Sequence, residues 1–193
     1  LRHVGIKVTI MVLTSGTDYF NEIIDNSLEP SIPNMYTLEA FCKVLEKRHV
    51  EKYPIHVKLD TGMHRLGFMT DELPELLDFL PSCHYVNVKS VFSHLAASED
   101  PACDAFTETQ VAMFRKNADA ISSVLGYRPM YHILNSAGIE RFPQYQFDMV
   151  RLGIGIYEVS AIPQVRLAPV ASFKCNILQI KHLKPEDGTI GYG

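Results

Sequence analysis

Short apolar segments alternate with longer amphipathic segments along most of this chain, and that alternation limits the fold more than any other feature. Residues 8–13, 55–59, 86–94, 131–134 and 149–156 are rich in the apolar and β-branched side chains typical of strands. Residues 18–25, 38–48, 71–80 and 104–125 have the spacing of helices, and residues 35–38 are either a short strand or the lead into a helix. Because the connections are too long for hairpins, we expect parallel strands. The pattern predicts an α/β fold, either a TIM-type (β/α)8 barrel or an open doubly wound sheet.

The pattern changes after Pro163. Residues 170–183 alternate apolar and polar side chains with no helix pattern behind them, which is typical of antiparallel β structure. We therefore divide the 193 residues into a partial barrel over residues 1–163 and the beginning of a C-terminal all-β domain over residues 164–193, with the boundary within residues 163–169.

Charge and cysteine content exclude several classes of protein. The 18 basic and 22 acidic residues give a net charge of −4, which argues against a nucleic-acid partner. No apolar run reaches the length of a membrane span, and Lys7 interrupts the apolar start of the chain, so it resembles a signal peptide poorly. Cys42, Cys83, Cys103 and Cys175 form no CxxC pair, and no histidine cluster gives them metal-site spacing. We expect a reduced, cytoplasmic protein that has no metal and no membrane partner.

Several of the expected strands end in polar or charged residues. Lys58 lies near the end of the strand at 55–59, with Asp60 and Arg65 after it, and His94 ends the next strand. His132, Asn135 and Ser136 lie around the end of the third, and the last strand carries Arg151 followed by Gly153 and Ile154. In either candidate fold the carboxyl ends of parallel strands meet at one edge. We therefore expect Lys58, Arg65, His94, Ser136 and Arg151 to converge.

The last two of these strand ends suggest a phosphate site. Ser136 supplies a hydroxyl donor, and the glycine at 153 lets an anion approach the main-chain N–H groups of Gly153 and Ile154. Simpler roles remain open for single residues. Ser136 could equally be a helix N-cap. Lys58 could instead form an ion pair with Asp60 or a glutamate, and His94 could form structural hydrogen bonds rather than take part in catalysis.

Five motifs, in order, resemble those of the alanine racemases. The segment KLDTGMHRLGF at residues 58–68 is similar to the family's DTGM-x-RLGF signature. SHLA at 93–96, HILNS at 132–136, RLGIGIY at 151–157 and GYG at 191–193 follow in the family's order. The resemblance implies a pyridoxal 5′-phosphate (PLP) enzyme that interconverts L-alanine and D-alanine for bacterial peptidoglycan. It also implies a (β/α)8 barrel followed by a β domain, and a head-to-tail homodimer whose active sites are shared between subunits.

The resemblance also implies which residues hold the cofactor. Arg151 matches the arginine that faces the pyridine nitrogen, and His132 matches the residue that holds this arginine. Because a guanidinium does not give up its proton near neutral pH, such an arginine leaves the ring nitrogen unprotonated and limits side reactions. The implied cofactor-binding residues are His132, Asn135, Ser136, Arg151, Gly153 and Ile154, of which Ser136 and the main chain of Gly153 and Ile154 match the phosphate cradle.

Four further residues match the family's catalytic set. Tyr192 matches the tyrosine base that reaches the partner's active site, and His94 matches a residue beside that tyrosine. Arg65 matches the residue that contacts the phenolic oxygen of PLP and the substrate carboxylate. Lys58 matches a lysine that is often carbamylated, which would turn a buried cation into an anion paired with Arg65.

The chain departs from the family pattern in one important respect. The lysine that forms the internal aldimine with PLP belongs to a motif on the first barrel strand, and the chain has no such motif. Because the motifs start near the third strand and the chain begins with Leu1, we expect a piece of a longer enzyme that binds PLP weakly and does not racemise alanine. The alternatives are another racemase on this scaffold, a basic amino-acid decarboxylase, a non-catalytic PLP-binding barrel, or a structural or dimerising piece. The signature and Arg151 argue against the decarboxylase, and the segment after Pro169 argues against the single barrel.

Overall fold

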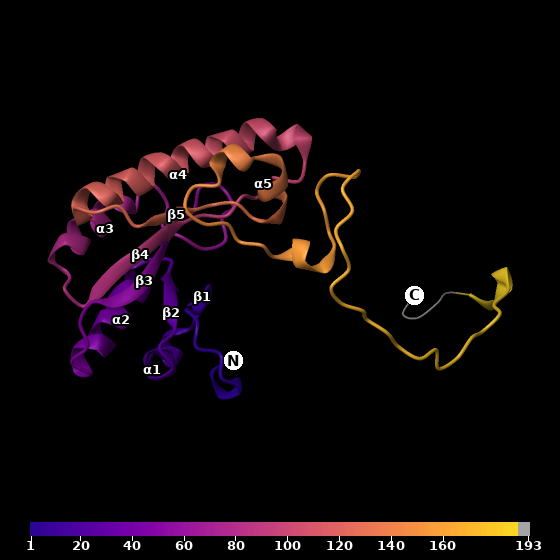
Figure 1. Ribbon diagram of the computed structural model, residues 1–193, viewed down its shortest axis with the longest axis horizontal. Helices are drawn as coiled ribbons and strands as arrows, with labels where there is room; N and C mark the ends of the chain where they lie inside the picture. The colour runs from indigo at the N-terminus through magenta and orange to yellow at the C-terminus, as the bar shows by residue number, and fades with distance from the viewer. Residues whose placement is uncertain (189–193) are drawn as a thin grey trace.

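Five parallel strands form the centre of the computed structural model, which describes residues 1–188. They are β1 (Met11–Val12), β2 (Glu29–Ile32), β3 (Tyr53–Lys58), β4 (Val86–Phe92) and β5 (Met130–His132), and they lie side by side in chain order (Figure 1). A doubly wound sheet reverses its strand order at one point, whereas a barrel adds each strand to the same edge. The unbroken order β1-β2-β3-β4-β5 therefore identifies part of a barrel.

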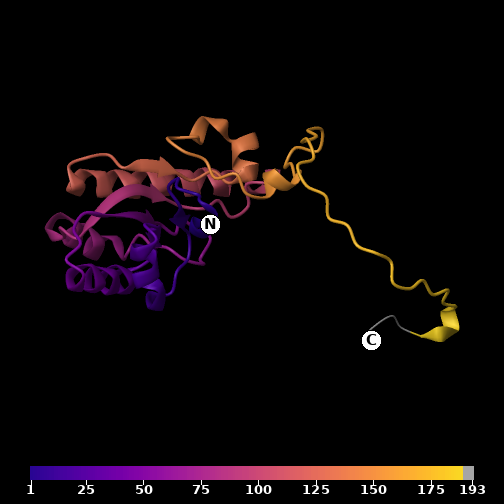
Figure 2. The same ribbon diagram turned by 60° about the horizontal axis from the view of Figure 1, so that its bottom comes forward.

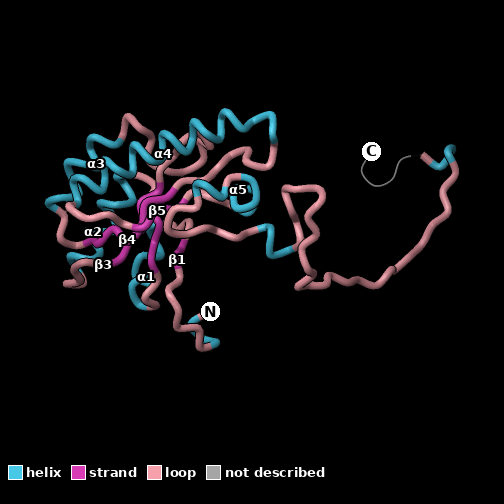
Figure 3. Tube along the Cα trace, turned by 45° about the horizontal axis from the view of Figure 1, so that its top comes forward, coloured by secondary structure: helices cyan, strands magenta, loops and turns pink. Residues whose placement is uncertain are grey.

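Helices connect the strands and cover the outer face of the sheet (Figure 3). They are α1 (Phe20–Asp25), α2 (Met35–Lys47), α3 (Leu73–Phe79), α4 (Asp104–Leu125) and, after β5, α5 (Ser136–Arg141). Asn34 begins α2, because its side chain accepts the main-chain N–H of Thr37. Gly126 ends α4 at a φ of 72°, a left-handed conformation that costs glycine little.

The two faces of the strands differ in chemistry. Ile55 and Val57 of β3 belong to the apolar core, together with Phe41 of α2 and Phe114 of α4. The alternate residues of β3, among them His56, point to the opposite face, because successive side chains of a strand alternate. The interior of the barrel therefore receives polar side chains, while the helices pack on the apolar outer face.

Two strands differ from the sequence prediction near the start of the chain. Of the expected strand at 8–13, only Met11 and Val12 are in a strand, and this strand, β1, pairs with β2. β2 itself was missed, because Pro30 lacks an N–H and is unusual inside a sheet. Residues 35–38 belong to α2, so the alternative of a strand there is wrong.

The expected strand at 149–156 is also wrong. Asp148 and Arg151 each donate one main-chain hydrogen bond toward β5 and the residues after it, but no ladder forms. Gly153 then leaves the extended region, with φ −111° and ψ −101°, and a 3-10 helix follows at Ile154–Tyr157. This break turns the main chain toward Ser136.

Beyond residue 163 the structure again differs from the prediction. Residues 164–188 contain no strand, and the segment runs away from the sheet (Figure 2) with Phe173 and Leu178 almost fully exposed. A strand requires a hydrogen-bonded neighbour, and none lies beside this segment in the described residues. Its assignment to a β domain stays a prediction. None of the helices described is long and apolar enough to cross a membrane.

Candidate functional site

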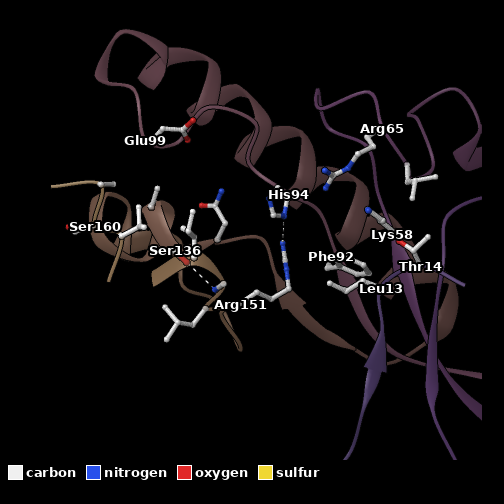
Figure 4. A pocket seen from close by; sticks show the side chains of 18 residues that line it. Leu13, Thr14, Lys58, Arg65, Phe92, His94, Glu99, Ser136, Arg151 and Ser160 are labelled. Carbon is white, nitrogen blue, oxygen red and sulfur yellow. Dashed lines mark hydrogen bonds between the residues drawn. The ribbon is translucent and has the colours of Figure 1, made fainter. Parts of the chain in front are cut away.

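A cavity of about 1110 Å³ lies at the carboxyl ends of the strands (Figure 4). A cavity of this volume is large enough to enclose a cofactor-sized ligand. Eight of the residues singled out from the sequence line it: Lys58, Arg65, His94, Asn135, Ser136, Arg151, Gly153 and Ile154. The expected convergence at one rim is therefore observed.

The cavity carries an excess of positive charge. Three cations line it, namely Lys58, Arg65 and Arg151, against one carboxylate, that of Glu99. Figure 4 shows the three cations reaching into the same space from different parts of the chain. Such a wall favours an anionic ligand, because low-dielectric surroundings strengthen its attraction to the cations.

Arg65 is held by a loop built on the end of β3. One carboxylate oxygen of Asp60 accepts the main-chain N–H groups of Gly62 at 2.9 Å and His64 at 3.1 Å. Burial alone would raise the pKa of Asp60, but these hydrogen bonds outweigh it and lower the pKa. Gly67 closes the loop at a φ of 131°, where an added Cβ would lie 2.6 Å from main-chain atoms.

Lys58 is a buried cation with no ion pair among the described residues, so the proposed alternative of a pair with Asp60 is not found. Its Nζ lies 5.8 Å from the ring centroid of Phe92, and the Arg151 guanidinium lies 5.2 Å from the same centroid. Burial lowers the pKa of Lys58, and the charges of Arg65 and Arg151 lower it further. Lys58 therefore gives up its proton more readily than an exposed lysine does.

Arg151 is anchored by acceptors from two strands and the residues after them. Its Nη1 donates to His132 Nδ1 at 2.6 Å and to the His132 carbonyl at 3.2 Å. Its Nη2 donates to the carbonyls of Ser93 and Ile133 and lies 3.3 Å from His94 Nδ1. Burial lowers the pKa of Arg151 to about 10, so the guanidinium keeps its charge at neutral pH.

Both histidines beside Arg151 are neutral at neutral pH. Burial, and then the charge of Arg151, lowers the pKa of His132 to about 3. The same two causes, followed by Arg65 and Lys58, lower the pKa of His94 to about 4. His132 does not line the cavity but lies beneath Arg151. Its ring stacks on that of Phe92, with the ring centroids 5.0 Å apart.

Ser136 and the turn after Arg151 form a small polar cradle. The Ser136 hydroxyl accepts the main-chain N–H groups of Gly153 and Gly155, each at 3.0 Å. A Cβ at Gly155 would lie 2.9 Å from Leu152 Cδ1 and 3.4 Å from Ser136 Oγ, so the turn is packed closely at this glycine. The N-cap alternative for Ser136 is wrong, because Asn135 caps α5 by accepting the N–H of Gly138.

Some site residues lie elsewhere or were missed. Tyr192 lies outside the described residues, 1–188. Leu13 and Thr14 also line the cavity, and both follow β1 directly, so the strand-end argument extended to β1 would have found them. Glu99 lies seven positions after β4, and no pattern marks it. No group of three or more His, Cys, Asp or Glu side chains within residues 1–188 is placed to hold a metal ion.

Both the family model and two curated relatives that match this chain are those of alanine racemases. The model of the alanine racemase N-terminal domain matches residues 1–161. All of this chain aligns with 51% of the alanine racemase of Nostoc sp. at 30% identity, and with 52% of that of Syntrophobacter fumaroxidans at 33% identity. The chain thus spans about half the length of the curated relatives it matches.

Solved structures agree on the fold. The alanine racemase from D-cycloserine-producing Streptomyces lavendulae has a TM-score of 0.77 at 27% identity, covering 84% of this chain and 43% of that one. The alanine racemase of Bartonella henselae, with covalently bound pyridoxal phosphate, has a TM-score of 0.71 at 24% identity, covering 83% and 44%. The partial TIM-type barrel expected from the sequence is confirmed.

Proposed function

The chain belongs to the family of alanine racemase N-terminal domains, and we propose from this premise that it forms part of a PLP-dependent enzyme that interconverts L-alanine and D-alanine. The observation that carries the proposal is the convergence of Lys58, Arg65 and Arg151 on one cavity beside the Ser136 cradle. A phosphate and a substrate carboxylate are both anions that such a cavity favours.

The chemistry of the cradle fits a phosphate. The Ser136 oxygen accepts the N–H groups of Gly153 and Gly155, which fixes the hydroxyl in place and leaves its hydrogen to donate to a phosphate oxygen. We propose that Ser136, Gly153 and Ile154 hold the phosphate, with Asn135 fixing the start of α5 beneath it. When bound, PLP acidifies the α-hydrogen of the amino acid by delocalising the charge left on the α-carbon.

Arg151 is proposed to donate to the pyridine nitrogen. A guanidinium is a donor only and cannot supply a proton at neutral pH, so the nitrogen stays unprotonated and draws less charge into the ring. Contacts to His132 and to three main-chain carbonyls fix the guanidinium in place. We infer that this arrangement favours returning the α-proton over side reactions such as transamination.

The remaining cations are proposed to bind the substrate. Arg65 binds the carboxylate of alanine and the phenolic oxygen of the cofactor, and its loop is fixed by the Asp60 hydrogen bonds. Carbamylation of Lys58 would remove an unpaired buried cation and supply an anion to Arg65, and the lowered pKa of Lys58 supports this reaction. His94 is proposed to adjoin the tyrosine base, for which Tyr192 is the candidate by its motif.

Finer parts of the proposal concern the whole protein. We propose a cytoplasmic homodimer whose subunits share active sites, with D-alanine supplied to peptidoglycan synthesis. The resemblance assigns the second base to a lysine, and the chain has no motif that matches it.

Proton exchange at the α-carbon tests the function. The intact protein, with any segments that flank this chain, is loaded with PLP and incubated with L-alanine in D₂O. We expect deuterium at the α-carbon together with D-alanine. Arg65→Gln should raise the KM for alanine, whereas Arg48→Gln, which removes surface contacts to Asp25 and Asn21 outside the cavity, should not. Inversion without a response to Arg65→Gln would contradict the assigned role, and the absence of exchange would contradict the function.

A further inference from the structure

A continuous series of side-chain hydrogen bonds crosses the sheet beneath the cavity. Arg151 Nη1 meets His132 Nδ1 at 2.6 Å, and His132 Nε2 meets Ser90 Oγ at 2.9 Å. Ser90 Oγ meets His56 Nδ1 at 2.6 Å, and His56 Nε2 meets Glu29 Oε2 at 2.9 Å. The series takes one side chain from each of β2, β3, β4 and β5.

The sheet register brings these side chains together. His56 and Ser90 are direct partners across β3 and β4. His132 is the partner of Phe92, which lies two positions after Ser90 on the same face of β4. His56, Ser90 and His132 are almost completely buried, so each depends on the others for its hydrogen bonds.

The two ends of the series fix its direction. Arg151 is a donor only, so His132 Nδ1 must accept and His132 Nε2 must carry the hydrogen. Glu29, when ionised, is an acceptor only, so His56 Nε2 must carry the hydrogen and His56 Nδ1 must accept. The Ser90 hydroxyl then accepts from His132 and donates to His56, and every member is satisfied.

We propose that Glu29, His56 and Ser90 are positioning residues that hold His132, and through it Arg151, in one orientation toward the pyridine ring. This inference rests on the proposed function, because the ring is the group that Arg151 would meet. None of the three side chains lines the cavity, so they act only through the series. An acceptor-only end and a donor-only end leave a single hydrogen-bond pattern, which prevents the His132 ring from flipping or changing tautomer.

The test compares Ser90→Ala with Ser31→Ala in the intact protein. Ser31 is a matched control because it is a buried serine of β2 whose hydroxyl donates only to the Leu13 carbonyl, outside the series. The first readout is NMR of the cofactor-free protein with ¹⁵N-labelled histidine, in which His56 and His132 should both show a hydrogen-bonded Nε2–H. In Ser90→Ala the His132 Nε2–H signal should move upfield or broaden by exchange, and in Ser31→Ala it should not.

The second readout is the affinity for pyridoxine 5′-phosphate, which has no aldehyde and so binds without a covalent bond. We expect Ser90→Ala to bind it about tenfold more weakly, the low end of what removal of an outer hydrogen-bond partner costs at metal sites, and Ser31→Ala to match the parent within about twofold. Glu29→Ala, at the partly exposed end, serves if Ser90→Ala does not fold, and should shift the His56 signal and, less, that of His132.

The outcomes separate the two proposals. If the parent protein does not bind pyridoxine 5′-phosphate, the proposed function is wrong, and the NMR signals still decide the positioning role. If it binds, an affinity that Ser90→Ala leaves unchanged overturns the positioning role alone. An Nδ1–H tautomer at His132, or a His132 signal indifferent to both Ser90→Ala and Glu29→Ala, also overturns it.

Discussion

Replacing Arg151 by glutamine should raise the pKa of His132 and that of His94, because the positive charge of Arg151 lowers both. The guanidinium lies 2.6 Å from His132 Nδ1 and 3.3 Å from His94 Nδ1. Arg151 is the second cause, after burial, of the lowered pKa of each. Glutamine keeps a hydrogen-bond donor and removes the charge, so the substitution isolates the electrostatic part.

Coulomb's law sets an upper bound on the effect, and the contribution of burial to each pKa reduces that bound. Two charges 3.3 Å apart repel by ~5 kcal/mol at an effective dielectric of about 20, which would change a pKa by more than three pH units. Burial, however, is the larger cause, so Arg151 accounts for less than half of the fall in the pKa of His132 from 6.5 to about 3. The pKa of His94 falls less, from 6.5 to about 4, so the part of that fall caused by Arg151 is smaller than for His132. We therefore expect Arg151→Gln to raise the pKa of each histidine by about one pH unit.

The assay is an NMR titration of the histidine ring signals between pH 3 and pH 8, and Arg65→Gln provides the contrast. Arg65 contributes to the lowered pKa of His94 but not to that of His132, so its removal should raise the first and leave the second unchanged. A parent pKa near 6.5 for either histidine, or equal responses of His132 to the two substitutions, would refute the reasoning about the electrostatics of the cavity.

Three further predictions concern stability and the thiols. Because the folded pKa of His132 and that of His94 both lie below the unfolded value, each histidine should lower the unfolding free energy by up to about 1.4 kcal/mol per pH unit as the pH drops from 6.5 toward 4, as denaturant titrations would detect; a flat profile would contradict this. Gly67→Ala should cost roughly 2–5 kcal/mol, because alanine adds strain at a φ of 131° to a main-chain clash, and a Tm unchanged by the substitution would contradict the loop geometry. Cys42 Sγ and Cys83 Sγ lie 3.5 Å apart, so diamide should join them in a disulfide visible by mass spectrometry of the peptides; a cross-link that persisted in Cys83→Ser would be incompatible with this pairing.

Local patterns were sufficient for much of the fold. The helix at 104–125 has the bounds of α4, because an apolar stripe and a terminal glycine mark it in sequence. The strands at 55–59 and 86–94 correspond to β3 and β4, whose carboxyl-terminal halves are buried on both faces. The sequence did not decide between a barrel and a doubly wound sheet, because strand order depends on contacts between distant segments.

Two differences between the prediction and the structure have physical reasons. A strand depends on its neighbour as well as on its own side chains, so residues 170–183 alternate in sequence yet form no strand where nothing pairs with them. β2 was missed because Pro30 is an unfavourable strand residue that the sheet tolerates near one end. In both cases the tertiary context outweighed the local preference.

The site was predicted where it follows strand ends and missed where it depends on register. Lys58, His94 and Ser136 lie at strand ends or just after them, so their convergence follows from parallel topology. Arg151 was expected in a strand that does not form, and its hydrogen bonds to His132 and to main-chain carbonyls place it in the cavity. His56 and Ser90 lie inside strands, and only the pairing of β3 with β4 places one beside the other. A polar residue within an otherwise apolar strand was the available signal, and it identifies a buried partner only once the register is known.

A phosphate site at Ser136 is tested by comparing pyridoxine 5′-phosphate with pyridoxine in calorimetric titrations of the cofactor-free intact protein. We expect saturable binding at one site per chain, at least about tenfold tighter for the phosphorylated compound. Ser136→Ala should lose this preference, because it removes the hydroxyl donor and the acceptor that holds the N–H groups of Gly153 and Gly155. Equal affinity for the two compounds, or a preference that survives Ser136→Ala, would show that the cradle does not bind the phosphate.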